Sequence, residues 1–305
     1  MLPEFKTIYD LVKRFPDERS CHQYLASRRW NGYMTCPHEG CEGDECYVFK
    51  DGIRYKCKSC NRIYTARTGT VFESSKIPLA RWFIAIYLIM HKRGISSVQL
   101  AKDIGVTQKT AWFVLHRLRS VLANEPAEQL SGVVEIDETF VGGKSRFRHK
   151  DKRVKYNPGR GWIDKTPVLG MLQRGGKVKA SVIPNVLMLT IQKQMLIHVR
   201  GGSDVMGDGF NGYRALNKHY ELQCCDHGKG IYGIGEVHTN GIENFWSHFK
   251  RHIGGTHIKV SRKHLDKYVQ ESVFRYNYRN LGIQEQFETI VSNMGCRLKY
   301  KDLIA

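Results

Sequence analysis

The sequence has no long hydrophobic run. Its longest apolar stretch is Trp82–Met90, whereas a membrane-spanning helix needs about 20 apolar residues. This absence excludes a spanning helix. The first ten residues, MLPEFKTIYD, lack a basic segment followed by an apolar core. We therefore expect no secretory signal. We expect a cytoplasmic protein of a prokaryote, associated with the nucleoid when it is bound to DNA.

Acidic residues are scarce relative to basic ones. The 305 residues include 29 Asp and Glu against 48 Lys and Arg, which gives a net charge of +19. Hydrophobic residues make up 41% and charged residues 25%, proportions that exclude wholesale disorder. The length is enough for about two domains of ordinary size. The positive charge predicts attraction to a polyanion, and nucleic acid is the commonest large one.

Cysteines are too few for a disulfide scaffold, and they are unevenly spread. Five of the nine lie within 25 residues, at Cys36, Cys41, Cys46, Cys57 and Cys60. In a reducing compartment such a cluster indicates metal binding. We expect Cys224 and Cys225 to be buried strand residues, because adjacent cysteines chelate one ion poorly and free cysteine is usually buried.

Two short cysteine pairs have the spacing of a zinc ribbon. Cys36 and Cys41 form the first pair, and Cys57 and Cys60 follow after 15 intervening residues. Four thiolates complete a tetrahedron around Zn²⁺ and leave no open position for chemistry. The alternating segment between the pairs, YVFKDGIRYKC, centres on Asp51-Gly52 and predicts a hairpin. A segment this short with few large aliphatic residues needs a metal to fold.

The spacing of the first cysteine pair does not decide the identity of the fourth zinc ligand. It has four residues between its members, where two is the commonest gap. Cys46 and His38 are therefore alternatives to Cys41 as the fourth zinc ligand.

Residues 78–124 have the pattern of a helix-turn-helix. Val98, Ala101 and Ile104 repeat at helical spacing before a Gly105-Val106 turn, and Thr107 then caps a helix with an apolar stripe. The exposed residues of that second helix, which we predict to contact DNA, are Gln108, Lys109, Thr110 and Arg117. A plain helical hairpin is the alternative, and the charge and the adjacent ribbon favour DNA binding.

Three segments place acids in contexts that suit metal binding. The segment 132–141 predicts a buried strand containing Asp137, and 203–212 predicts a second strand that ends in Asp208 at a Gly-rich turn. Glu243 lies in the first turn of an amphipathic helix, with Lys250 two turns along the same face. Buried carboxylates are costly unless they are paired or bound to a metal. Three such acids could hold two Mg²⁺ ions for phosphoryl transfer.

Neighbouring polar residues compete with these acids. Glu138 alternates to the opposite strand face from Asp137, so we do not expect it to be a ligand. Glu135 and Asp204 share a strand with the favoured acids and are weaker competitors. Asn240 could be an N-cap of the helix.

The order of these motifs resembles a known family. A zinc ribbon, a helix-turn-helix, and then EIDETFVGGK, DGFNGY and HTNGIENFWSHFKR are similar to the DDE-type insertion-sequence transposases of the insertion-sequence-1595 family. The resemblance covers about residues 36–279. It implies a ribonuclease-H-like catalytic domain, a structural Zn²⁺ and a catalytic Mg²⁺ or Mn²⁺.

The resemblance also implies roles for particular residues. Asp137, Asp208 and Glu243 match the three catalytic acids, with 34 residues between the second and third, and Lys250 matches the basic residue that follows them. Some members have an Asn as third ligand, so Asn240 is an accessory candidate. The wide first cysteine gap departs from the commoner ribbon pattern.

A strongly basic segment follows the strand of Asp137. Residues 144–165 contain nine Lys and Arg against two Asp and show no apolar period. We predict an exposed loop in which Lys144, Arg146 and Arg148 contact DNA phosphates. A solvated, partly disordered loop is the alternative.

Together these features predict a multi-domain protein. We expect a helical leader (1–35), a zinc ribbon (36–75), a helix-turn-helix (76–126), a ribonuclease-H-like mixed-sheet domain (127–290) and a C-terminal tail (291–305). The predicted function is a DNA transposase that binds terminal inverted repeats, cuts and joins strands, and acts as a homo-oligomer on end and target DNA, with no membrane partner. A non-catalytic DNA-binding regulator and a nuclease without strand transfer are the alternatives.

Overall fold

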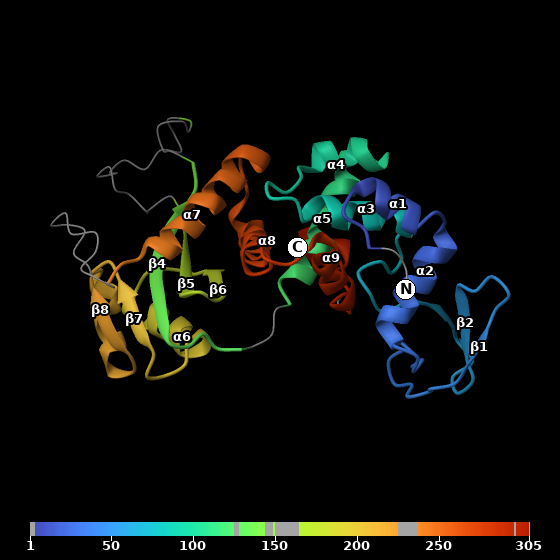
Figure 1. Cartoon of the computed structure of the whole chain (residues 1–305), viewed down its shortest axis with the longest axis horizontal. Coiled ribbons are helices and arrows are strands. Elements are labelled where there is room, and N and C mark those ends of the chain that lie inside the picture. Colours follow the sequence, from blue (N-terminus) through green and yellow to red (C-terminus); the bar gives the residue numbers. More distant parts are fainter. Residues whose placement is uncertain are drawn as a thin grey trace. The chain divides into compact units, whose positions relative to one another are not determined.

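The chain forms two structural units. The computed structural model describes residues 4–124, 128–143, 149, 165–224, 237–295 and 297–304 (Figure 1). The first unit comprises Met1–Asn124 with Asn280–Ala305, and the second comprises Glu125–Arg279. Within the described ranges, no helix has both the length and the apolar character needed to cross a membrane.

The first unit combines helices with a small sheet. Its helices are α1 (Ile8–Arg14), α2 (Glu18–Trp30), α3 (Leu79–Ile89), α4 (Ser97–Ile104), α5 (Gln108–Leu122), α9 (Ile283–Ser292) and α10 (Tyr300–Ile304). The predicted helical leader is thus present. Capping boxes begin its helices: Thr7 and Asp10 cap α1, and Asp17 and Ser20 cap α2.

Helix α9 packs in the first unit. The ring of Phe287 lies 5.2 Å from that of Phe5 and 5.3 Å from that of Phe83, both edge-on. The predicted boundary at residue 290 differs from this division, which falls at Arg279. Such a helix carries an apolar face that any core can bury, so its pattern does not indicate which domain it joins.

The ribbon segment forms a three-stranded antiparallel sheet. Its strands are β1 (Cys46–Val48), β2 (Arg54–Cys57) and β3 (Ile63–Thr65), in the order β1-β2-β3. The β1–β2 turn is closed by Asp51, whose Oδ1 accepts hydrogen bonds from the backbone N–H of Ile53 (3.0 Å) and Arg54 (3.1 Å). The hairpin prediction at Asp51-Gly52 is confirmed.

The second unit is built on a five-stranded mixed sheet. Its strands are β4 (Val133–Val141), β5 (Thr166–Gln173), β6 (Val178–Val182), β7 (Asp204–Gly207) and β8 (Glu221–Cys224). Their order is β6-β5-β4-β7-β8. Pairing is antiparallel from β4 through β5 to β6, and parallel from β4 through β7 to β8. This sheet, with helices on both faces, confirms the predicted ribonuclease-H-like fold.

The two faces of this sheet carry separate cores. Helix α6 (Met188–His198) and the 3₁₀ helix η3 (Asn211–Lys218) cover one face, where Ile136 packs with Ile191 and Tyr213. Helices α7 (Asn240–His252) and α8 (Leu265–Asn277) cover the other (Figure 1). Short helices η5 (Ile253–His257) and η6 (Arg262–His264) join α7 to α8.

Helix α7 lies against the sheet through the predicted apolar stripe. Ile242, Phe245, Trp246 and Phe249 are all buried. A Cβ at Gly170 of β5 would lie only 2.5 Å from Trp246 Cζ2, so the missing side chain lets the indole reach the sheet. Close packing therefore fixes α7 over β4 and β5.

One strand prediction needs correction. Cys224 lies in β8, as expected, but its side chain is exposed. Strand β8 is an edge strand of the sheet, and an edge strand need not be buried on both faces. Cys225 lies outside the described residues.

Candidate metal and catalytic sites

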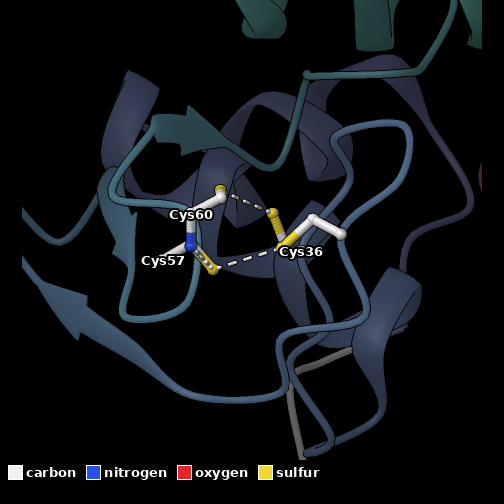
Figure 2. A group of neighbouring side chains, drawn as sticks. Cys36, Cys57 and Cys60 are labelled. Atoms are coloured by element: carbon white, nitrogen blue, oxygen red, sulfur yellow. Dashed lines mark hydrogen bonds between the residues drawn. The ribbon is translucent and has the colours of Figure 1, made fainter.

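The ribbon brings four cysteine sulfurs together. The ligand atoms of Cys36, Cys41, Cys57 and Cys60 all lie within 4.8 Å of one another. The Sγ atoms of Cys36 and Cys60 are 3.7 Å apart, as are those of Cys41 and Cys57. Figure 2 shows the sulfurs of Cys36, Cys57 and Cys60 directed toward one another. Four sulfur donors suit a closed tetrahedral zinc site.

The alternatives to Cys41 lie outside this group. Cys46 Sγ lies 3.4 Å from the sulfur of Met34, and His38 is not among the grouped ligands. His38 instead supports the loop, because its carbonyl oxygen accepts a hydrogen bond of 3.1 Å from Cys41 N–H. The predicted set of four cysteines is thus the set that the fold assembles.

A hydrogen bond and burial shift the pKa values of two of these thiols in opposite directions. The N–H of Arg62 hydrogen-bonds to Cys60 and lowers its thiol pKa to about 6, while burial raises the pKa of Cys36 to about 12. A Cβ at Gly43 would lie 2.8 Å from Cys57 Sγ. The cluster therefore has room for sulfur donors and little room for other side chains.

Two of the predicted acids lie on adjacent parallel strands. Strand β4 pairs with β7 so that Val133 is opposite Asp204, Val134 opposite Val205 and Glu135 opposite Met206. The same offset places Asp137 opposite Asp208, which directly follows β7. Neighbouring strands lie about 4.8 Å apart, so these two carboxylates share one edge of the sheet.

The third acid is delivered by helix α7. Its N-terminal turn is tied to β4, because Ile242 N–H donates a hydrogen bond of 2.9 Å to Glu135 Oε2. Glu135 is 1% exposed, and its other oxygen forms a 2.9 Å ion pair with Arg174. These contacts make Glu135 an anchor for α7, and they hold Glu243 near the strand that carries Asp137.

The acids affect the pKa of Asp137. Burial raises the pKa of Asp137 to about 7, and the charges of Glu138, Asp208 and Glu243 add to the rise. Burial also raises the pKa of Glu138, whose Oε2 accepts a hydrogen bond from the Tyr213 hydroxyl. The fold therefore gathers negative charge at one place, which disfavours the ionised form of Asp137.

The acids do not form a closed ligand set. Among the described residues, the groups whose ligand atoms all lie within 4.8 Å include neither Asp137 nor Asp208 nor Glu243. Glu243 is exposed, and its Oε1 accepts a 2.9 Å hydrogen bond from the Thr239 hydroxyl. Of the three acids, Glu243 is exposed, and Asp137 and Asp208 are partly buried.

The accessory candidates also lie on α7. Asn240 is its first residue and Thr239 is its N-cap, so Asn240 does not occupy the capping position. Lys250 is exposed two turns beyond Glu243. Both side chains lie on the polar face of the helix, away from its buried stripe.

The helix-turn-helix forms as predicted. Gly105 ends α4 with φ +62°, and Thr107 caps α5 by accepting a 3.3 Å hydrogen bond from Thr110 N–H. Gln108 Nε2 donates to Ser97 Oγ at 2.8 Å. The Lys109 ammonium lies 5.3 Å from the ring centroid of Tyr300. These predicted contact residues thus begin α5.

Arg117 does not occupy the predicted surface position. Its side chain is buried, and its guanidinium donates to the carbonyls of Val71 (2.7 Å), Glu73 (3.2 Å) and Leu298 (3.2 Å). All of its partners lie in the first unit, so Arg117 joins segments of that unit. The other three predicted phosphate contacts, Lys144, Arg146 and Arg148, lie outside the described residues.

The structure adds one cluster that the sequence did not reveal. Ligand atoms of His252, His257 and Glu271 lie within 4.8 Å of one another. Arg275 already occupies this site, because it pairs with Glu271 and its Nη1 lies 3.2 Å from His252 Nε2. The histidines are five residues apart and the acid lies on another helix, so no local motif marks them.

Two family models and two relatives are similar to this chain. The ISXO2-like transposase domain matches residues 129–277, and the transposase zinc-ribbon domain matches residues 16–62. The chain is 32% identical over 291 residues to an uncharacterized protein in transposable element ISH50 of Halobacterium salinarum, covering 92% of this chain and 98% of that protein. It is 30% identical over 105 residues to an uncharacterized transposase-like protein of Haemophilus influenzae, covering 33% and 81%.

Structural similarity is weaker. The crystal structure of a pre-cleavage Mos1 transpososome aligns with 70% of this chain and 78% of that chain, at 13% identity and a TM-score of 0.29. The zinc-ribbon match begins at residue 16 and so includes α2, which the predicted boundary at 36 left out.

Proposed function

The chain belongs to the insertion-sequence-1595 family of transposases, and from this premise we propose that it cuts and joins DNA strands at the ends of an insertion sequence. Asp137, Asp208 and Glu243 are the catalytic acids of this proposal. Asn240 and Lys250 are accessory residues on the same helix face as Glu243.

One observation carries the proposal. The pairing of β4 with β7 reaches Glu135 opposite Met206, two residues before Asp137 and Asp208, and the Ile242 N–H bond to Glu135 holds the first turn of α7 over the same strand. Three segments far apart in the sequence thus converge on one sheet edge. The acids that the fold brings together are the ones that the family motifs single out.

The three carboxylates would hold Mg²⁺ or Mn²⁺, because clustered carboxylate oxygens suit hard divalent cations. When bound, two such ions activate the attacking oxygen and stabilise the leaving oxygen of an in-line phosphoryl displacement. The chain supplies the fixed geometry: β4 and β7 set the spacing of the two Asp side chains, and α7 positions Glu243. Burial is the main cause of the raised pKa of Asp137, and neighbouring negative charge, which a cation would neutralise, adds to it.

The first unit supports recognition of DNA. Its ribbon and helix-turn-helix lie outside the catalytic unit, and Gln108, Lys109 and Thr110 stand at the N-terminus of α5, where recognition helices contact bases and phosphates. The net charge of +19 favours phosphate contacts. We propose that terminal inverted repeats are bound here and that two copies of the chain pair the two ends.

The proposal is tested by cutting of a labelled duplex that carries the DNA flanking the gene. Purified protein is incubated with Mg²⁺ or Mn²⁺, and products are resolved by length. We expect nicking at one position and joined products. Asp208→Asn should abolish both and leave end binding intact, while Asp204→Asn, four residues earlier in β7, should cut as the parent does. Binding without cutting by the parent would instead favour a DNA-binding regulator.

A further inference from the structure

The second unit contains a groove that is lined by the end of β4 and by the segment after α7. It encloses about 1030 Å³, and its floor is formed by Phe249, Ile253 and Leu265, which are all buried. One wall is the end of β4, at Phe140 and Val141. The opposite wall is the segment 258–262 that follows η5. The floor and walls are therefore largely apolar.

The rim of the groove is basic. Lys250, Lys259 and Arg262 are exposed side chains that line it. Among its described lining residues there is neither Asp nor Glu. An apolar floor with a cationic rim complements a nucleotide, whose base is flat and apolar on its faces and whose phosphate is anionic.

One residue of the groove lining has a buried hydroxyl. Thr166, the first residue of β5, lines the groove and is 9% exposed. Its Oγ1 has no hydrogen-bond partner among the described residues. Because burying an unpaired hydroxyl is costly, this atom indicates a ligand with a polar edge. A nucleobase has both donors and acceptors on its edge.

An exposed isoleucine stands at the lip of the groove. Ile258 is 85% exposed and has φ +62° and ψ −56°. The N–H of Lys259 donates to the His257 carbonyl at 2.6 Å, so the segment forms a γ-turn of the rarer, strained type. Positive φ is a genuine outlier for a β-branched residue, and such strain clusters at binding sites.

Buried contacts hold this turn in place. The ring of His257 lies edge-on to Tyr268 of α8, with centroids 4.8 Å apart. His257 Nε2 lies 3.1 Å from His252 Nε2, and His252 Nδ1 lies 3.0 Å from Ser272 Oγ. The strained turn is therefore built on the core of the second unit, and it presents Ile258 outward.

The distance between the groove and the acid cluster follows from residue counts along helix α7 and strand β4. Lys250 is seven residues beyond Glu243, which is about 10 Å along a helix. Val141 is four residues beyond Asp137, which is about 13 Å along a strand. At about 3.4 Å per nucleotide along one strand, the groove lies about three nucleotides from the acid cluster.

We propose that this groove holds one unstacked nucleotide of the element end, about three positions from the phosphate that is cut. Ile258 fills the gap that the base leaves in the stack, as apolar wedges do in other DNA complexes. Thr166 pairs with the edge of the base, and Lys259 and Arg262 contact the flanking phosphates. The inference rests on the proposed function, because it requires end DNA at the acid cluster.

The test places 2-aminopurine, which fluoresces when unstacked, singly at each of the first six positions on either side of the cut. Fluorescence of the end duplex is measured with Asp208→Asn protein, so that the DNA stays intact. We expect a several-fold rise at one position, about three nucleotides from the cut. Adding Ile258→Ala should remove most of that rise, and Thr166→Val should reduce it. Adding Leu189→Ala, at a leucine on α6 that is 74% exposed, should leave it unchanged.

The outcomes separate this inference from the proposed function. If the parent cuts the duplex and no position brightens, the groove does not hold a base and the inference alone fails. If brightening survives both Ile258→Ala and Thr166→Val, the base is unstacked elsewhere and the inference also fails. If no end duplex is bound or cut at all, the inference fails together with the proposed function. Circular dichroism checks that each variant is folded.

Discussion

The cysteine cluster and the acid cluster are both candidate metal sites, but the fold prepares them differently. The four cysteine ligand atoms already lie within 4.8 Å of one another, whereas the three acids do not form such a closed set. In the cysteine cluster, the thiol pKa of Cys60 is lowered to about 6. In the acid cluster, the carboxyl pKa of Asp137 is raised to about 7.

This difference is the one we expect between a structural site and the proposed catalytic site. A structural zinc site needs every ligand in place, since the metal supplies the folding energy of its small sheet. A catalytic site must keep coordination positions free for substrate, so its ligands do not close around the metal. The charge of each ligand then shifts the pKa of the others. The comparison predicts that removing a cysteine ligand lowers stability, whereas removing a carboxylate ligand lowers the rate of cutting.

The largest expected effect is on the ribbon. Cys57→Ser should reduce the zinc content from one ion per chain to near zero and should unfold the three-stranded sheet, because a structural site of this class contributes on the order of 10 kcal/mol. Zinc content by emission spectroscopy and hydrogen exchange of β1–β3 measure the two effects. Cys46→Ser is the matched control and should keep its zinc. Loss of zinc from both variants would contradict the assignment of Cys41.

The next effect is on catalysis. Asp137→Asn should lower the rate of cutting by about 10³-fold or more, which is about 4 kcal/mol, and should not destabilise the second unit. The substitution removes a charge that Glu138, Asp208 and Glu243 repel. Cutting rates and thermal unfolding are measured on the same preparation. A variant that loses stability and keeps its cutting rate would reverse the comparison.

The same carboxyl predicts a pH dependence in Mg²⁺-free buffer. Its pKa is about 7 in the folded protein, against an ordinary value of 3.8. The folded state therefore holds a proton that the unfolded state releases, and the free energy of unfolding should fall as pH rises from about 4 to about 7. Asp137→Asn should flatten this slope in urea titrations. An unchanged slope would show that Asp137 ionises normally.

The histidine cluster in the second unit sharpens the comparison. Ligand atoms of His252, His257 and Glu271 are as close as those of the cysteines, but Arg275 already supplies a positive charge there. We expect no second tightly bound metal, so zinc content should not change in His257→Ala. Arg275→Ala should lower the free energy of unfolding by about 3 to 5 kcal/mol, because it removes the guanidinium that pairs with the fully buried Glu271 carboxylate. A second zinc ion in the parent would show that close ligand atoms are enough to bind zinc at this cluster, in spite of Arg275.

The smallest effects distinguish two basic residues of α5. Lys109→Ala should weaken end binding a few-fold, about 1 kcal/mol, without changing stability. Arg117→Ala should do the reverse, since its guanidinium donates to three backbone carbonyls. Fluorescence anisotropy and thermal unfolding measure the pair. Weakened binding by a stable Arg117→Ala protein would restore its predicted role at the DNA surface.

Local patterns predicted much of this molecule. Cysteine spacing indicated the ribbon ligands, and Gly105 and Thr107 marked the end of α4 and the start of α5. Each of these signals lies within one short segment of the sequence. The register that places Asp208 opposite Asp137 could not be read in this way, because it depends on strand pairing.

The errors have the same origin. Helix α9 and the side chain of Arg117 are placed by contacts with distant segments, such as Phe5 for the first and Leu298 for the second. The γ-turn at Ile258 depends on His257 packing against another helix. Tertiary contacts decide these features, and amphipathic periodicity does not encode them.

The most direct test of the account exchanges a carboxylate for a thiol at the acid cluster. Asp208→Cys is assayed for cutting of the end duplex in Mg²⁺ and in Mn²⁺, beside Asp204→Cys and the parent. A thiolate is a poor ligand for Mg²⁺ and a better one for softer metals. If Asp208 binds the catalytic metal, Asp208→Cys should cut in Mn²⁺ and fail in Mg²⁺, while Asp204→Cys should cut in both. Equal cutting by Asp208→Cys in the two metals, or the same switch in Asp204→Cys, would contradict the account.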